Sequence, residues 1–309
     1  MSKGGISMAS LEVEVNQQEM SPTIESPMRA VWRRFKRNRL AVIGLVVIII
    51  FVLLAIFAPF LTPYDPNRAD FRARNQPPSR QHWLGTDDMG RDILTRTLYG
   101  GRISLSVGLV SVGISLSLGV ILGALSGYFG GWVDALIMRV ADVFYSFPFL
   151  ILAITATALL GPSIYNIMMI LGVLSWPGPA RLLRAEFLRL KNVEFVTASV
   201  AIGAKSKRTM FRHMLPNAIA PLLVSATLGV ASSILSEAGL SFLGLGVPPP
   251  APSWGNMLNR ARPLHILRNM PWMWIPPGIA ILLIVLSINF VGDGLRDALD
   301  PHQDAREKH

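Results

Sequence analysis

The sequence contains no cysteine and only five histidines among its 309 residues. Without cysteine there can be no disulfide, no thiolate metal site and no cysteine nucleophile. The histidines are scattered, with no HxH or HxxxH pair, so no metal site is indicated. Charged residues are also scarce, at 16% of the chain against roughly 25% in a typical soluble domain. These shortages exclude a freely soluble enzyme.

Motifs for catalysis are missing as well. Neither GxSxG nor HExxH occurs in the sequence. The segment Gly203-Ala204-Lys205-Ser206 comes nearest to a Walker A loop, but its lysine does not follow a second glycine and no strand is predicted before it. We therefore predict no catalytic residue, no cofactor-binding residue and no metal ligand in this chain.

Apolar sequence is what the chain has in abundance, with 51% hydrophobic residues. Five stretches contain no Asp, Glu, Lys or Arg: 40–64, 103–133, 143–180, 214–236 and 269–292. Each is long enough for a transmembrane helix of about 20 residues. The stretch 143–180 is too long for one helix and divides at Gly161-Pro162-Ser163, which favours a turn. We predict an all-α membrane protein with six transmembrane helices: 40–61, 103–128, 134–160, 163–184, 217–246 and 272–293.

Positive charge predicts the orientation of these spans. The chain has 29 Lys and Arg against 19 Asp and Glu, a net charge of +10. Basic residues gather in 29–39 and in the loop 185–216, which the positive-inside rule places in the cytoplasm with both termini. Their partner is expected to be membrane lipid rather than nucleic acid. The remaining segments are expected as a mobile cytoplasmic tail at 1–28, extracytoplasmic segments at 62–102 and 247–271, and a cytoplasmic tail at 294–309.

A few charges fall at membrane depth. Glu237 lies in the fifth span, where a central carboxylate costs about 2.5–3.5 kcal/mol, so it is expected to face the bundle interior or water. Arg139 and Asp142 are three residues apart near the start of the third span and are expected to pair on one helix face. A structural role is favoured for these residues over a transport role. The alternative is an ion-coupled secondary transporter, in which Glu237 would carry the ion or proton.

The outer segment 62–102 is expected to hold a short interfacial helix over Arg91–Tyr99, with Thr86 or Asp88 as its cap. A structural role is favoured for this helix, with contact to a substrate as the alternative. The apolar residues of this helix are expected to face the lipid boundary: Ile93, Leu94 and Leu98.

The cytoplasmic loop is the most informative segment. Residues 194–202 suit a short helix with small side chains, and Gly203 permits a turn that a side chain would obstruct. Pro216 suits the start of the next span. From these residues alone the loop is either a basic segment that fixes topology or a docking element for a partner.

This loop resembles the EAA loop of importer-type ABC transporter permeases. In that pattern EAA is followed by three residues, Gly, nine residues and I-x-L-P; here Thr197-Ala198-Ser199, Gly203, His213 and Leu215-Pro216 stand at those positions. Thr197 replaces the glutamate of the pattern. The resemblance implies that residues 194–212 form the region that docks on an ATP-binding subunit. The implied coupling residues are Glu194, Thr197, Ala198, Ser199, Gly203, Ala204, His213, Leu215 and Pro216.

Further segments resemble the C-type subunit of the dipeptide/oligopeptide permease group, over about residues 30–301. They are Leu84-Gly85-Thr86-Asp87 with Gly90-Arg91-Asp92, Gly127-Tyr128-Phe129-Gly130-Gly131, Leu240–Gly246, Trp254-Gly255 with Met257-Leu258, and the stretch 292–301. The resemblance implies a multi-pass subunit of a type I ABC importer in the bacterial cytoplasmic (inner) membrane.

The same resemblance implies the partners. They are a B-type permease subunit in a heterodimer, one or two ABC ATP-binding subunits that bind ATP and Mg, and an extracytoplasmic solute-binding protein. Di- or oligopeptides are the expected substrates, with oligosaccharides or nickel as alternatives. A membrane scaffold that docks partners without moving solute is a further alternative.

Overall fold

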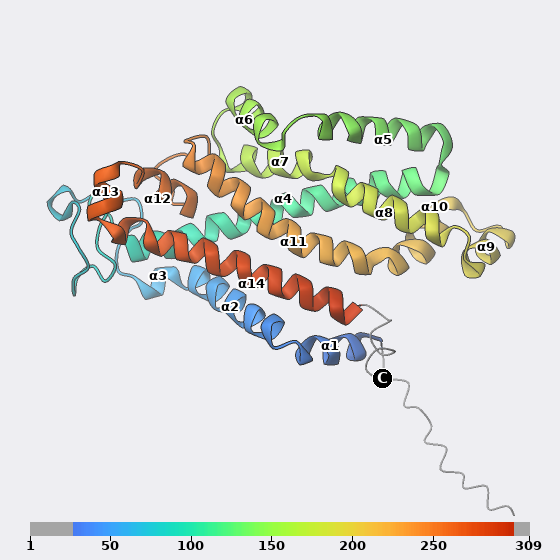
Figure 1. Ribbon diagram of the computed structural model, residues 1–309, viewed down its shortest axis with the longest axis horizontal. Coiled ribbons are helices and arrows are strands. Elements are labelled where there is room, and N and C mark those ends of the chain that lie inside the picture. Colours follow the sequence, from blue (N-terminus) through green and yellow to red (C-terminus); the bar gives the residue numbers. More distant parts are fainter. Residues whose placement is uncertain (1–26, 300–309) are drawn as a thin grey trace, which may run out of the picture.

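The computed structural model describes residues 27–299. Nearly all of the tail expected at 1–28, and residues 300–309 of the tail expected at 294–309, lie outside this range. Within it the chain is helical, and its one element of β pairing is an isolated bridge between Thr86 and Asp92. Figure 1 shows long helices that run side by side along the long axis of the molecule. The all-α prediction is confirmed for this part of the chain.

The helices have the following bounds: α1 Pro27–Arg37, α2 Arg39–Ile56, α3 Ala58–Leu61, η1 Phe71–Ala73, α4 Ile93–Phe129, α5 Gly131–Ser146, α6 Phe149–Leu160, α7 Ile164–Ser175, α8 Pro177–Leu190, α9 Glu194–Ala201, α10 Ser206–Arg208, η2 Thr209–Met214, α11 Leu215–Phe242, α12 Trp254–Arg260, α13 Leu264–Asn269, η3 Pro271–Met273 and α14 Ile275–Leu299. The first of the long ones, α2, begins after Asn38, whose side chain accepts a hydrogen bond from the backbone N–H of Ala41 at 3.2 Å.

Four helical runs between residues 27 and 299 are long and apolar enough to cross a membrane: Arg39–Ile56, Ile93–Phe129, Ser206–Phe242 and Ile275–Leu299. A fifth is obtained if α5 and α6 together make one span. The helix α7 has 12 residues, so at 1.5 Å per residue it covers about 18 Å of a hydrocarbon core that is about 30 Å thick. It reaches further only together with α8, which follows it after Trp176.

The span expected at 134–160 is not one straight helix. It is divided into α5 and α6, which meet at an angle of 89°. The break lies at Phe147 and Pro148, with Phe147 in an extended conformation. A proline cannot donate the helical hydrogen bond and pushes the residue before it out of the helical region. Hydropathy alone did not reveal this break, because both sides of it are apolar.

The span expected at 103–128 belongs to a longer helix, because α4 begins at Ile93. The separate interfacial helix expected over Arg91–Tyr99 is therefore wrong: most of it is the first part of α4. A cap by Thr86 or Asp88 is also wrong, because Asp92 caps α4 by accepting the backbone N–H of Thr95 at 2.8 Å.

Two glycines near the start of α4 lie against Trp254. Added β-carbons at Gly100 and Gly101 would lie 3.3 Å and 3.2 Å from the Trp254 ring, so these glycines admit an indole against the helix. The expectation that Ile93 faces lipid is also wrong. Ile93 is buried with Met257 and other residues of the segment that carries Trp254.

Small residues allow α4 and α8 to pack closely. A β-carbon at Gly119, Gly123 or Gly127 would come within 2.6 Å of an atom of Pro179, Ala180 or Phe187, respectively. These glycines are four residues apart and so lie on one face of α4. The close approach of α4 and α8 positions the segment that follows α8.

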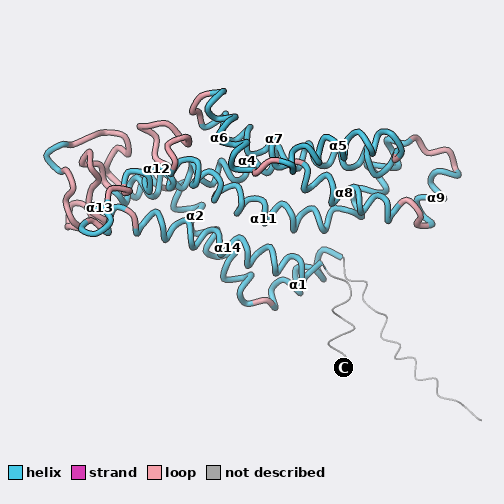
Figure 2. Tube along the Cα trace, turned by 45° about the horizontal axis from the view of Figure 1, so that its top comes forward, coloured by secondary structure: helices cyan, strands magenta, loops and turns pink. Residues whose placement is uncertain are grey.

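The molecule has two distinct ends. Figures 1 and 2 show α9 at one end of the long axis, and α12 and α13 at the other; Figure 1 places α10 beside α9. We call these the α9 end and the α13 end. The irregular segments of the chain are concentrated at the α13 end, where loops surround α12 and α13 (Figure 2). The helix α1 and the last turns of α14 lie toward the α9 end (Figure 1).

Candidate functional site

The helix α9 covers Glu194–Ala201, in agreement with the short helix expected at 194–202. It ends in a Schellman motif, in which the N–H of Gly203 donates to the carbonyl of Val200 at 2.9 Å and the N–H of Ala204 to that of Ser199 at 3.1 Å. Gly203 has φ = 84°, a left-handed conformation that costs a residue with a β-carbon about 1–2 kcal/mol. The glycine of the EAA-like pattern is thus required by the backbone.

One face of α9 is buried and the other is exposed. Val196 and Ser199 point inward, whereas Thr197 and Ala198 are exposed. The Thr197 hydroxyl donates to the carbonyl of Glu194 at 2.9 Å, so this side chain folds back on its own helix. Of the three residues at the EAA positions, two are therefore available to a partner.

The buried face of α9 attaches it to the long helices. Val196 belongs to an apolar cluster with Ala124 of α4, Leu183, Phe187 and Leu190 of α8, Met210 and Met214 of η2, and Ala218 and Leu222 of α11. Side chains in such a cluster are packed as densely as a crystal, so a displacement of α9 is transmitted to these helices. The structure thus connects the α9 end to the interior of the bundle.

The exposed face of α9 is largely apolar, and the segment that follows it is basic. Phe195, Val200 and Ile202 expose 41%, 51% and 86% of their surface. A shallow groove lies beside them, lined by Lys205, Lys207, Arg208, Phe211, Arg212 and Pro216. An apolar patch with a charged rim is typical of a surface that binds another protein.

The structure places the remaining residues of the EAA-like pattern where η2 meets α11. His213 is half-buried in the last turn of η2, and its carbonyl accepts the side-chain amide of Asn217 at 2.7 Å. Leu215 and Pro216 open α11, as the prediction for Pro216 required. The predicted site therefore has two parts, the helix α9 and the start of α11, which the Val196 cluster joins.

Glu237 lies on α11 and is fully buried, in agreement with the expectation that it faces the interior. Its carboxylate accepts hydrogen bonds from the hydroxyls of Ser104 at 3.1 Å and Ser241 at 2.6 Å. These hydroxyls in turn accept the backbone N–H groups of Trp254 and Val247 at 3.4 and 3.2 Å. The glutamate therefore joins α4, α11 and the segment before α12.

The expected pair of Arg139 and Asp142 is not formed. Asp142 bonds to Arg181 of α8 at 2.6 Å, and both side chains are about half exposed, at 53% and 44%. A second pair that sequence reasoning missed lies nearby: Arg184 donates two hydrogen bonds to Asp134, at 2.5 and 2.6 Å. Both pairs connect α5 to α8. Their position at the borders of charge-free stretches is the signal that could have revealed them.

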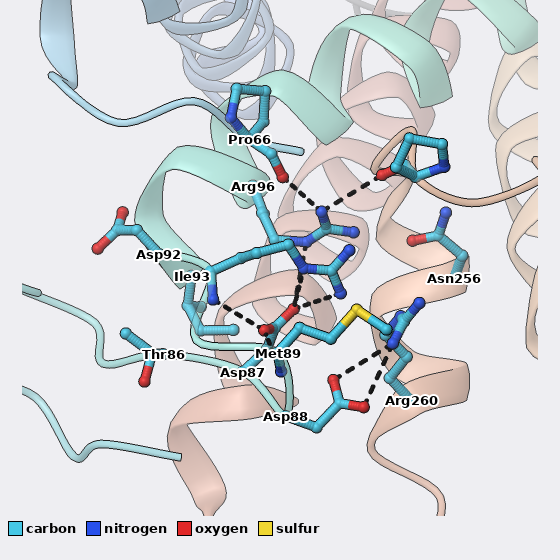
Figure 3. A network of polar contacts seen from close by, with 12 residues as sticks. Pro66, Thr86, Asp87, Asp88, Met89, Asp92, Ile93, Arg96, Asn256 and Arg260 are labelled. Carbon is cyan, nitrogen blue, oxygen red and sulfur yellow. Dashed lines mark hydrogen bonds and ion pairs between the residues drawn. The ribbon is translucent and has the colours of Figure 1, made fainter. Parts of the chain in front are cut away.

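The LGTD segment lies at the α13 end, in a network of buried charges that Figure 3 shows. Asp87 accepts hydrogen bonds from the backbone N–H of Arg91 at 3.0 Å and from its Nε at 2.8 Å. The Nε atom of Arg96 lies 3.6 Å from the same carboxylate. All three side chains are almost fully buried. The two arginines thus share one acceptor inside the protein.

Arg96 also joins three separate segments. Its Nη1 atom donates to the carbonyl of Pro66 at 2.6 Å and to that of Pro250 at 3.4 Å (Figure 3). Close by, Asp88 pairs with Arg260 of α12 at 3.3 Å. Arg96 was missed in the sequence because it follows the LGTDxxGRD pattern, which ends at Asp92. A charged residue within an otherwise apolar helix is the sign that could have revealed it. The motif residues therefore hold the α13 end together.

Two protein-family profiles match this chain. Residues 119–304 match the binding-protein-dependent transport system inner membrane component, and residues 26–78 match the N-terminal TM domain of oligopeptide transport permease C. Both matches agree with the family resemblance found from the EAA-like loop and the LGTD segment.

Curated relatives match over most of their length. A peptide permease protein of Brucella suis is 47% identical over 283 residues, which is 92% of this chain and 94% of the relative. A dipeptide transport system permease protein of Alkalihalophilus pseudofirmus is 46% identical over 90% of this chain and 91% of the relative. An oligopeptide transport system permease protein of Bacillus subtilis is 43% identical over 87% of both chains.

A solved structure shares the fold. It is the methionine ABC transporter MetNI in an inward-facing conformation, with a TM-score of 0.52 and 19% identity over 66% of this chain and 97% of that chain. The apolar helices, the matched profiles and the relatives agree on one assignment. This chain belongs to the binding-protein-dependent transport system inner membrane component family, the membrane-embedded permease subunits of bacterial ABC transporters.

Proposed function

We propose that this chain is one of two permease subunits of an ATP-driven importer that takes up di- or oligopeptides. The observation that carries this proposal is the helix α9, whose exposed face is apolar and whose buried face is packed against α4, α8 and α11. The names of the relatives, which are peptide, dipeptide and oligopeptide permeases, support peptides as the substrates.

The exposed face of α9 suits a separate ATP-binding subunit. ATP and Mg are bound by that partner, and closure of two such subunits displaces α9. The Val196 cluster passes the displacement to α4, α8 and α11, whose rearrangement opens and closes the path between this subunit and its B-type partner. An extracytoplasmic solute-binding protein delivers the peptide at the opposite, α13 end.

The proposed topology has six spans, with both termini and α9 in the cytoplasm. Two of these spans are composite: α5 with α6, and α7 with α8. The basic residues of α1 and of the loop around α9 support the orientation, because both lie toward the same end of the molecule (Figure 1). An even number of spans then puts the C-terminus on the same side as α1, the cytoplasmic side.

Co-purification tests the docking role of α9. The tagged chain is extracted in mild detergent from cells that express its partners, and the bound proteins are identified by mass spectrometry. We expect a second permease and one or two ATPases with Walker motifs. Recovery of this chain alone, or with partners that show no peptide-dependent ATP turnover, would contradict the proposal.

Two variants of Gly203 make the test specific. Gly203→Val places a β-branched residue at φ = 84° and is expected to disrupt the end of α9, so that the ATPases are lost. Gly203→Asn is the matched control, because asparagine tolerates this conformation. A β-carbon at Gly203 meets nothing within 4 Å, so the difference between the variants reports backbone conformation rather than a clash. Equal ATPase recovery with both variants would exclude α9 as the docking element.

The alternative function is that of a secondary transporter, driven by an ion gradient instead of ATP, in which Glu237 binds the coupling ion. Its carboxylate is bonded to two serine hydroxyls and fully buried, an arrangement that suits a structural link. None of the contacts of Glu237 favours ion transport over this role.

A further inference from the structure

A groove runs into the bundle between α4, α7, α8 and α11, with a volume of about 240 Å³. Six serines line it: Ser115, Ser175, Ser225, Ser232, Ser233 and Ser236. The other lining residues are apolar side chains, Pro179 and Gly229, and the lining includes no charged residue. Four of the serines are on α11, in the part of the helix between the Val196 cluster and Glu237. We call this feature the serine groove.

Two of these serines are more than nine-tenths buried. Ser115 and Ser233 expose 5% and 7% of their surface. Within residues 27–299, neither hydroxyl has a hydrogen-bond partner, although each side chain lines the groove. Neither oxygen is among the fully enclosed, unpartnered side-chain atoms of these residues, so both hydroxyls reach the open space of the groove. A polar group there must take its hydrogen-bond partner from whatever fills the groove.

Other serines of the same helices behave differently. Ser106 donates to the carbonyl of Arg102 at 2.6 Å, and Ser117 to that of Gly113 at 2.7 Å. This bond to the residue four positions earlier is the usual way in which a helix satisfies a serine away from water. Ser115 lies between these two on α4 and does not make it. Its hydroxyl is therefore left available to something that enters the groove.

We propose that the serine groove is the surface by which this subunit contacts the transported solute, and that it binds the peptide main chain rather than its side chains. A hydroxyl both donates and accepts hydrogen bonds, so it suits the alternating N–H and C=O groups of a peptide. The lack of charge in the lining gives no preference between acidic and basic side chains. This inference rests on the proposed import of peptides.

Cysteine substitution tests whether the groove is open to water and solute. The chain has no native cysteine, so a single introduced thiol is its only one. Ser225→Cys and Ser232→Cys are expected to react with a membrane-impermeant methanethiosulfonate at least about tenfold faster than the control Ser117→Cys. Tri-alanine, supplied to the complete transporter with its binding protein, is expected to slow this reaction.

The control lies on α4 with an exposed side chain that does not line the groove. Equal, slow reaction of all three thiols would show that lipid or a partner helix covers the groove, and would overturn the inference. Reaction that tri-alanine leaves unchanged would overturn it as well.

Removal of the hydroxyls of Ser115 and Ser233 tests what the groove recognises. In the reconstituted transporter, Ser115→Ala with Ser233→Ala is expected to lower the uptake of tri-alanine, tri-lysine and tri-glutamate alike, by about tenfold. Ser117→Ala is the matched control. A loss confined to one of the charged peptides, or no loss, would overturn the inference.

Wild-type uptake separates the two proposals. If the wild-type complex imports no peptide, the proposed function fails and this inference fails with it. If the wild type imports peptides and the double variant does so equally well, the proposed function stands and the serine groove alone is excluded. Recovery of the second permease and the ATPases with the double variant, in the amounts found for the wild type, shows that the complex has assembled.

Discussion

At the scale of single residues, Asp87 is the acceptor on which the α13 end depends. Its carboxylate faces Arg91 at 2.6 Å and Arg96 at 3.6 Å, and all three side chains are nearly inaccessible. Charges removed from water are stable only when they are paired, and the loss of one partner leaves the others without compensation. Because Arg96 also reaches Pro66 and Pro250, the pairing of Asp87 affects three segments at once.

We therefore expect Asp87→Asn to lower the free energy of unfolding by about 3–5 kcal/mol, the usual effect of breaking a buried ion pair. Asp142→Asn is the matched control, because it breaks an ion pair whose members are half exposed and which is worth about 0–1 kcal/mol. Thermal unfolding of the purified chain in detergent measures both. Similar effects of the two substitutions would show that the Asp87 network is not a structural centre.

Glu237 gives a second prediction at this scale. Glu237→Gln keeps the shape and one acceptor of the side chain, so both folding and peptide uptake are expected to persist. Glu237→Leu leaves the hydroxyls of Ser104 and Ser241 without their acceptor and is expected to cost about 1–3 kcal/mol of stability. The measurements are peptide uptake in proteoliposomes and thermal unfolding. Loss of uptake by a stably folded Glu237→Gln variant would favour the ion-coupled alternative.

The sequence indicated which charged residues have a structural role, but it did not identify all the residues that they contact. The burial of Glu237 follows from the cost of a carboxylate in the membrane and was predicted. The pairing of Asp142 with Arg181 was not, because it depends on how α5 packs against α8. The cap of α4 by Asp92 was missed for a similar reason: a cap can be assigned only once the first residue of the helix is known.

At the scale of elements, α4 is the helix around which the others pack. Its glycines contact α8 at Gly119, Gly123 and Gly127, and Trp254 at Gly100 and Gly101. A β-carbon at Gly123 would lie 2.5 Å from the carbonyl oxygen of Ala180, whereas one at Gly113, on the same helix, would meet nothing within 4 Å. The same residue type thus has two different environments on one helix.

Gly123→Leu is expected to destabilise the chain by at least about 1–3 kcal/mol, the usual cost of an overpacked interior. Gly113→Leu makes the same chemical change at an open position and is expected to leave stability nearly unchanged. Thermal unfolding and the yield of monodisperse protein in detergent compare the two. If both variants behave alike, the close packing of α4 on α8 does not contribute to stability.

The sequence predicted the elements well where hydropathy determines them. Charge-free stretches marked the four long apolar runs, and Gly203 marked the end of α9. The break at Pro148 was missed because apolar residues lie on both sides of it. The extension of α4 back to Ile93 was missed because Arg96 and Arg102 interrupt the apolar sequence before residue 103.

At the scale of the whole molecule, the two ends have different physical characters. The α13 end is held by buried ion pairs, whereas the α9 end exposes an apolar face on a short helix. The long helices α4 and α11 connect them, and both contribute to the Val196 cluster, the serine groove and the bonds of Glu237. A displacement at α9 therefore acts on the helices that line the groove.

This arrangement predicts the source of energy for transport. In proteoliposomes that contain the complete complex, peptide uptake is expected to continue when ionophores collapse all ion gradients, and to stop when ATP is withheld from the side of α9. The reason is that the exposed face of α9 is the proposed site of attachment for a partner ATPase, while Glu237 is enclosed by hydrogen bonds. The Gly203→Val complex serves as the control, because it is expected to show no ATP-dependent uptake. Uptake that follows an ion gradient in the absence of ATP would contradict the importer mechanism. It would favour the alternative, an ion-coupled secondary transporter that uses Glu237.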